Sequence, residues 1–302
     1  MRGLRCAFIA LVAAFLASAP AGAQDRRLKV VASFSILADL VKNVGGERVD
    51  VTPLVGAGSD AHVYAPTPAD ARRAAQARLI AVNGLGFENW LTRLVQASGS
   101  KAAIVTATKG IKARRVVGGH GDKHDHGHDD PHAWQNVENV KTYVANIRDA
   151  LVAADPAGAD AYRANAAAYG AKLDTLEKEV RDTIARIPHS RRQIITNHNA
   201  FGYFEAAYGI QFIAPQGVAT DSEPSARDVA RIIRQIRRQK IPAVFLENIS
   251  DPRLMQRIAK ETGAKIGGTL YSDALTAPNG PAPTYIDLIR HNISTLAGAL
   301  TS

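Results

Sequence analysis

The sequence predicts an α/β protein made of two lobes, each with a four-stranded parallel sheet, joined by one long helix. Short apolar runs typical of strands alternate with amphipathic stretches, which is the pattern of parallel sheets covered by helices on both faces. This alternation occurs twice, in segments 28–106 and 193–269. Between the two copies lies the most periodic segment of the chain, which predicts the joining helix.

Each copy supplies four strands and three helices. In the first copy, the predicted strands are 28–33, 49–55, 79–83 and 102–106, and the predicted helices are 36–44, 67–76 and 89–97. In the second copy, the predicted strands are 193–196, 211–214, 243–246 and 265–269, and the predicted helices are 201–208, 225–239 and 252–262.

The joining helix is predicted from apolar residues that recur at intervals of three and four: Tyr162, Ala166, Tyr169, Leu173, Leu176, Val180, Ile184 and Ile187. Asp155 is expected to cap its start, with Pro156 in its first turn, and Pro188 ends it. About 30 residues at about 1.5 Å each give about 45 Å, which is longer than one lobe. The helix should therefore span both lobes and restrict their movement.

The N-terminus has the three parts of a secretory signal peptide. Arg2 and Arg5 precede an apolar stretch, residues 7–16, that is too short to span a membrane comfortably, and Ala23 ends a small-residue cleavage site. The one cysteine, Cys6, precedes the apolar stretch, whereas a lipid-anchor cysteine would follow it. The expected product is a soluble, unlipidated periplasmic protein without disulfides or thiolate metal ligands.

The predicted organisation has four parts. Residues 1–23 form the signal peptide, 24–155 the N-terminal lobe, 156–188 the linking helix and 189–302 the C-terminal lobe. Removal of the signal peptide lowers the formal charge from +9 to +7, since it carries two arginines and no acids. The basic residues lie on helical segments without interleaved aromatic residues. We therefore interpret them as solvated helix faces and expect no nucleic-acid partner.

Four residues spaced almost evenly along the chain predict a shared metal site. His62, His132, His198 and Asp273 are separated by 70, 66 and 75 residues, and each follows a predicted strand. Ligands of parallel sheets bind beyond the carboxyl ends of the strands, where loops converge. Two of the four come from each lobe, so the site would lie in the cleft between them. Three imidazoles and one carboxylate suit zinc, although the donor set alone does not exclude copper.

Three motifs carry a resemblance to a known family. Asp60-Ala61-His62-Val63-Tyr64, Asp130-Pro131-His132-Ala133-Trp134 and His198-Asn199-Ala200-Phe201 resemble the ligand signatures of the cluster A-I solute-binding proteins. These proteins serve ATP-binding-cassette importers of zinc and manganese, and the zinc branch is the more similar. The resemblance covers the mature chain and implies His62, His132, His198 and Asp273 as the ligands. Manganese members carry a glutamate in the place of His198.

Further residues are candidates for auxiliary roles. A segment at 118–130 contains His120, His124, His126 and His128, and it is expected to be a loop that either gathers zinc or binds it adventitiously. Glu247 is a possible partner of a metal-bound imidazole, and Trp134, Phe201 and Phe204 either shield the cleft or pack in the core.

The resemblance implies a monomeric, non-enzymatic protein that captures Zn²⁺ and delivers it to an inner-membrane permease of the ATP-binding-cassette type. A periplasmic protein that donates the metal is a possible second partner. A manganese or iron carrier of the same fold is the nearest alternative. A zinc hydrolase is less favoured, because four protein ligands would fill a tetrahedron and leave no open position for water.

Overall fold

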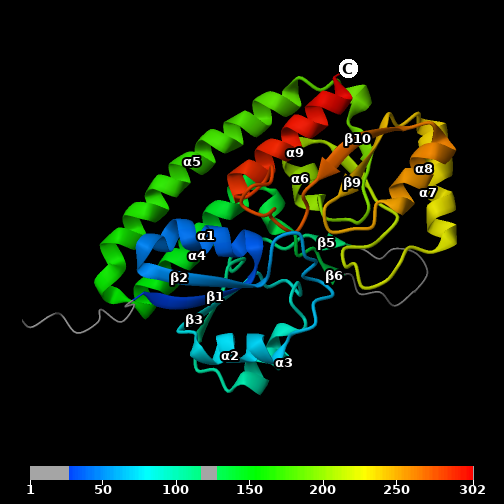
Figure 1. The fold of residues 1–302 in the computed structure, drawn as a ribbon. Coiled ribbons are helices and arrows are strands. Elements are labelled where there is room, and N and C mark those ends of the chain that lie inside the picture. The colour runs from blue at the N-terminus through cyan, green and yellow to red at the C-terminus, as the bar shows by residue number, and fades with distance from the viewer. Residues whose placement is uncertain (1–26, 117–127, 302) are drawn as a thin grey trace, which may run out of the picture.

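The computed structural model describes residues 27–116 and 128–301 (Figure 1). The predicted signal peptide and the histidines at 120, 124 and 126 lie outside the described residues. No helix in the described part of the chain is long and apolar enough to cross a lipid bilayer.

The N-terminal sheet has four parallel strands in the order β2-β1-β3-β4. The strands are β1 (Leu28–Phe34), β2 (Val49–Val55), β3 (Leu79–Val82) and β4 (Ala103–Thr106). One face is covered by α1 (Ser35–Gly45) and α4 (Val137–Ala154), on which the long helix α5 (Ala159–Ala185) packs. The other face is covered by α2 (Pro68–Gln76) and α3 (Leu91–Ser98) (Figure 1). All four residues of β3 are buried, as expected for a central strand.

The C-terminal sheet repeats this plan in the order β10-β9-β7-β8. Its strands are β7 (Gln193–Ile195), β8 (Gln211–Ile213), β9 (Ala243–Glu247) and β10 (Lys265–Leu270). Helices α7 (Ala226–Gln239) and α8 (Arg253–Thr262) lie on one side, and α6 (Gly202–Tyr208) and α9 (Tyr285–Leu300) on the other (Figure 1). Helix α7 buries Ile232, Ile233 and Ile236 and exposes most of its arginines, as an amphipathic helix does.

The long helix α5 runs along both lobes (Figure 1). It packs against α1 and α4 of the first lobe and against α6 and α9 of the second. Its buried stripe contains the residues predicted from the sequence, from Tyr162 to Ile184. At 27 residues it is about 40 Å long.

The prediction that Asp155 caps this helix is wrong. A short 3₁₀ turn, Pro156–Gly158, intervenes, and the helix starts after Gly158 without a side-chain cap. The Asp155 carboxylate instead accepts hydrogen bonds from Arg48 (2.9 Å) and from the hydroxyl of Tyr162 (2.7 Å). It therefore ties the start of α5 to the N-terminal lobe.

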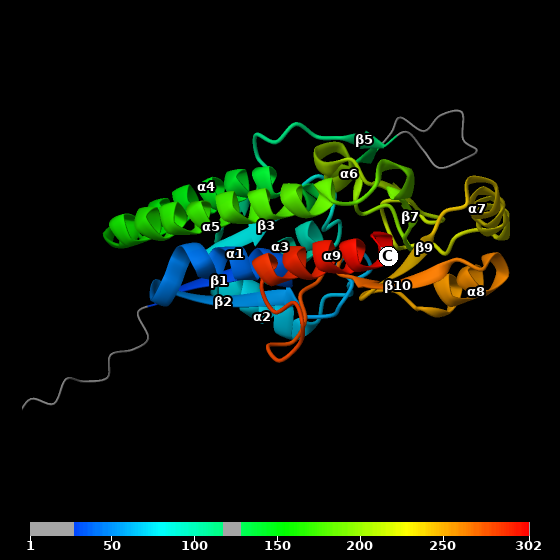
Figure 2. The same ribbon diagram turned by 90° about the horizontal axis from the view of Figure 1, so that it is seen from above.

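A long helix and a short ribbon of two strands are absent from the sequence-based prediction. Helix α4 has 18 residues and lies alongside α5 (Figure 2). Its buried positions Val140, Tyr143, Val144, Ile147 and Leu151 do follow a helical period. A two-stranded antiparallel ribbon, β5 (Arg115–Val116) with β6 (His128–Asp129), flanks the His-rich segment. Two-residue strands are too short to leave a period in the sequence.

Hydrogen bonds between the lobes hold the two sheets with their strand ends towards each other. The indole N–H of Trp134 donates to the carbonyl of Ser272 (2.9 Å), and the N–H of Gly58 donates to the carbonyl of Leu275 (2.9 Å). The hydroxyl of Tyr285, at the start of α9, donates to the carbonyl of Trp134 (2.8 Å). The loops that follow the strands of both sheets therefore meet at one interface.

Candidate metal centre

The structure brings together the four residues that the sequence selected. His62 follows β2, His132 follows β6, His198 follows β7 and Asp273 follows β10. One donor atom from each lies within 4.8 Å of all the others. The four residues come from segments that are far apart in the sequence, and the cluster lies at the interface between the lobes.

The distances within this cluster match the space that a single ion needs. His62 Nε2 lies 3.3 Å from His132 Nε2 and 3.3 Å from Asp273 Oδ2. His198 Nε2 lies 3.2 Å from the same carboxylate oxygen, and His132 Nε2 lies 3.6 Å from Asp273 Oδ1. A zinc tetrahedron with ligand distances of about 2.0–2.1 Å has edges of about 3.3 Å.

Burial leaves the inward-facing atoms without protein partners. The side chains of His132, His198 and Asp273 are fully buried, whereas the side chain of His62 is 5% exposed. Within residues 27–116 and 128–301, His198 Nε2 and both carboxylate oxygens of Asp273 have no hydrogen-bond partner. Since buried polar atoms are normally paired, a cation at the centre would complete this arrangement.

Two of the three imidazoles are held from behind by buried carboxylates. His198 Nδ1 lies 2.5 Å from Glu247 Oε2, and His132 Nδ1 lies 2.8 Å from Asp130 Oδ1. A carboxylate acceptor requires a proton on Nδ1, which leaves the lone pair of Nε2 facing Asp273. Glu247 therefore occupies the supporting position considered from the sequence, whereas Asp130 is a supporting residue that the sequence reasoning missed.

These contacts change the pKa values of the cluster. Burial disfavours the charged imidazole of His198, but the charges of Glu247 and Asp273 outweigh it and raise its pKa well above the usual value. The pKa of His132 is also raised, because Asp273 and Asp130 outweigh burial. Burial prevails at His62 and lowers its pKa. Burial opposes ionisation of Asp273, yet His198 and His132 lower its pKa well below the ordinary range.

Aromatic rings form one wall of the cluster. The ring centroid of Trp134 lies 5.2 Å from that of His132, and the ring of Phe87 lies 4.7 Å from that of His62. Phe87 was not selected from the sequence. Phe201, by contrast, stacks on Phe212 at 4.5 Å, and Phe204 packs edge-on against Tyr208, which is core packing of the C-terminal lobe.

His62 borders a recess of about 670 Å³ that opens to the surface. Its other lining residues include Leu85 on the N-terminal lobe, Asp221 on the C-terminal lobe, and His128 and Asp129 on β6. His128 is the one histidine of the His-rich segment that lies in the described part of the chain. The recess is where solvent approaches the cluster.

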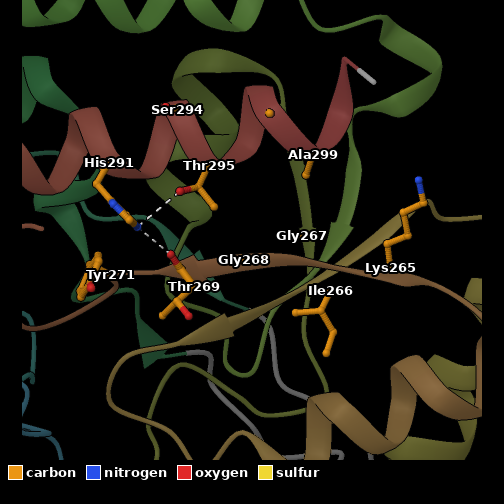
Figure 3. Close-up of a pocket in the computed structure, with 11 residues that line it drawn as sticks. Lys265, Ile266, Gly267, Gly268, Thr269, Tyr271, His291, Ser294, Thr295 and Ala299 are labelled. Atoms are coloured by element: carbon orange, nitrogen blue, oxygen red, sulfur yellow. Dashed lines mark hydrogen bonds between the residues drawn. The ribbon is translucent and has the colours of Figure 1, made fainter.

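A different groove lies between β10 and α9 (Figure 3). It is lined by Gly267, Gly268 and Thr269 on the strand and by His291 and Thr295 on the helix. His291 is half-buried, and its Nε2 lies 3.0 Å from the carbonyl oxygen of Thr269, which accepts its hydrogen bond. Among the described residues of this groove, no second imidazole or carboxylate accompanies it, so the groove offers no metal site.

Comparisons with known proteins agree on one family. Residues 30–299 match the profile of the family described as ZnuA, zinc-uptake complex component A, periplasmic. The manganese-binding lipoprotein MntA of Halalkalibacterium halodurans is 36% identical, with 100% of each chain covered. The iron-binding protein YfeA of Yersinia pestis is 36% identical, with 90% of this chain and 86% of the relative covered. Among solved structures, the periplasmic zinc-binding protein TroA of Treponema pallidum superposes with a TM-score of 0.84 at 30% identity, over 91% of this chain and all of TroA.

Proposed function

Because this chain belongs to the ZnuA family, the substrate-binding proteins of metal ATP-binding-cassette transporters, we propose that it captures Zn²⁺ in the periplasm and delivers it to a membrane permease. Members of the family bind and hand over metal ions and are not enzymes. The proposal concerns the choice of zinc and the residues that hold it.

The observation that carries the proposal is the composition and spacing of the cluster. His62, His132 and His198 supply three nitrogen atoms and Asp273 supplies oxygen, with 3.2–3.6 Å between neighbouring donors. Hard cations such as Mn²⁺ favour more oxygen ligands and a larger coordination number. A nitrogen-rich set of four at these separations suits tetrahedral zinc better.

Manganese or iron is the second candidate. Two relatives that match nearly the whole chain are named for manganese and iron binding. In such a site, both oxygens of Asp273 would have to bind the ion to raise the number of ligands. Both oxygens face the cluster without a hydrogen-bond partner, so this second mode has the atoms it requires.

Competition between zinc and manganese for the metal-free mature protein tests the choice. Trp134 lies against His132, so its fluorescence should report occupancy of the site. We expect zinc to displace manganese at equal concentrations and manganese to fail to displace zinc. Displacement of zinc by stoichiometric manganese would favour the second candidate.

The remaining assignments belong to the same proposal. The mature protein begins after Ala23, carries no lipid, acts as a monomer and has lobes at 24–155 and 189–302 joined by 156–188. The His-rich segment 118–130 gathers zinc or receives it from a periplasmic donor. The mass of the exported protein tests the cleavage site and the missing lipid together, because an acylated N-terminus adds several hundred daltons.

A further inference from the structure

Asp60 makes a contact that the metal cluster does not require. The segments Asp60-Ala61-His62 and Asp130-Pro131-His132 have the same spacing, and in both the backbone N–H of the histidine donates to the aspartate Oδ1, at 2.8 and 3.0 Å. Asp130 also holds the ring of its histidine. Asp60 instead turns its second oxygen to the other lobe, where Oδ2 accepts a hydrogen bond from the hydroxyl of Thr220 at 2.6 Å.

Thr220 belongs to the loop of residues 214–225 that joins β8 to α7, here called the rim loop. The start of the rim loop is fixed to the segment of another ligand, because the N–H of Asn199 donates to the carbonyl of Gly217 at 3.0 Å. The backbone of Gln216 pairs with that of His198 in an isolated parallel β-bridge. The side-chain amide of Gln216 donates to the carbonyl of Ser222 at 2.7 Å. The rim loop therefore contacts the segments of two ligands, one in each lobe.

The rim loop forms one wall of the recess that leads to His62. Gly217, Val218, Ala219, Asp221 and Ser222 line the recess together with His62. The other three ligand side chains are fully buried, so the recess is the side from which water or a chelator reaches the ion. An ion that leaves through it must pass between the rim loop and the His62 segment.

We propose that the Asp60–Thr220 hydrogen bond, which lines an adjoining recess, is a latch that holds the two walls of this passage together and that it sets the rate of metal exchange. The inference rests on the proposed function, since it assumes that the cluster holds the transported ion. Asp60 acts as a positioning residue: it fixes the backbone at His62 and ties that segment to the rim loop. A hydroxyl donating to a carboxylate makes a strong hydrogen bond, and its loss lets the two walls separate more often.

The latch affects rates more than affinity. Among the described residues, the Thr220 hydroxyl donates to Asp60 and no hydrogen bond joins it to any of the four ligands, so its loss should leave the metal–ligand bonds unchanged. The rate constants of metal binding and of metal release should then both increase. The dissociation constant, which is their ratio, should change less than either rate constant. A residue that merely stabilised the fold would not produce this pattern, because general loosening of the site would weaken the affinity as well.

Chelator-induced release of zinc from the loaded mature protein, followed by stopped-flow, tests the proposal. We expect Thr220→Val and Thr220→Ala to release zinc about tenfold faster, because a hydrogen bond to a charged acceptor is lost. Thr220→Ser keeps the hydroxyl and should release zinc within about twofold of the wild-type rate. The matched control is Thr262→Val, since Thr262 is also half-buried but donates to the carbonyl of Ile258 within α8 (2.7 Å).

Two further results distinguish the latch from a merely structural role of Thr220 and from failure of the proposed function. In an Asp60→Ala background, Thr220→Val should add little to the release rate, because the carboxylate that accepts the Thr220 hydrogen bond is already absent. Equal release rates for the wild type, Thr220→Val and Thr220→Ala, or an equal increase in Thr262→Val, would overturn the latch and leave the proposed function intact. If the wild type binds no zinc at a single tight site, the proposed function itself fails, and the latch fails with it.

Discussion

Replacing Glu247 with glutamine should weaken zinc binding while leaving the fold in place. The carboxylate is fully buried, and Oε1 accepts hydrogen bonds from the backbone N–H groups of Asn197 (2.7 Å) and His198 (3.0 Å). Oε2 faces Nδ1 of His198. Glutamine has one acceptor oxygen, so its NH₂ group must face either the backbone donors or the ring. In the second case Nδ1 loses its acceptor, and the proton moves to Nε2, the atom that should bind the metal.

The expected loss is about 10- to 100-fold in zinc affinity, which is typical for removal of a carboxylate behind a metal-bound imidazole. This corresponds to about 1.4–2.7 kcal/mol. Competition with a chelator of known zinc affinity measures it directly. An unchanged affinity would refute the argument that Glu247 orients His198.

Glu88→Gln is the matched control for this substitution. Glu88 is also a buried carboxylate, and its Oε1 accepts hydrogen bonds from the Ser33 hydroxyl (2.5 Å) and from the N–H of Asn83 (2.6 Å). None of the hydrogen bonds in the described part of the chain joins Glu88 to any of the four predicted ligands. Both variants should lower the melting temperature of the metal-free protein, but only Glu247→Gln should lower the zinc affinity.

Three other predictions concern pH, the His-rich segment and a glycine. The pKa values of His132 and His198 are raised, and zinc needs both imidazoles neutral, so affinity should fall as pH decreases from 8 to 5.5; a flat titration would contradict this ligand set. In the metal-free protein, the raised pKa values of the same two histidines stabilise the fold below the unfolded pKa of about 6.5, and this contribution is lost as pH rises through the raised values. Calorimetry of the metal-free protein should therefore show that these two groups contribute more to stability as pH decreases, which is opposite to the trend of the zinc affinity. Deletion of residues 119–129 should leave one tight site with affinity within about twofold of wild type, and loss of that site would show that the ligands are misassigned. Gly202→Ala would place a methyl carbon 2.6 Å from Asp130 Oδ2 and should weaken zinc binding about tenfold or more by displacing this carboxylate, as measured by the same chelator competition.

Much of the fold was predictable because its signals are local. Strands β1, β3 and β9 are largely buried apolar runs, and the stripe of α5 from Tyr162 to Ile184 has a clear period. The prediction of the cap of α5 was wrong, because contacts with residues distant in the sequence determine where the Asp155 side chain points. Asp155 has the residue type and position of a helix cap. Its carboxylate instead accepts a hydrogen bond from the guanidinium of Arg48, which is more than a hundred residues away in the sequence.

The site was predictable for a different reason. Parallel sheets bring the carboxyl ends of their strands to one edge, so the sequence predicts His198 and Asp273 at this edge of the second sheet and His62 at the same edge of the first. Their supporting carboxylates could not be assigned in the same way. Asp60 and Asp130 both stand two residues before a histidine, yet only Asp130 contacts the imidazole. Identical spacing gives different roles because the position of Thr220 in the other lobe decides where the second oxygen of Asp60 points.

A crystal structure of the zinc-loaded mature protein, with anomalous scattering measured at the zinc edge, tests the central claim most directly. We expect one ion between the lobes, about 2.0–2.1 Å from Nε2 of His62, His132 and His198, with oxygen from Asp273 as the fourth ligand. An ion held elsewhere, or a water molecule in the place of any of these four side chains, would contradict it.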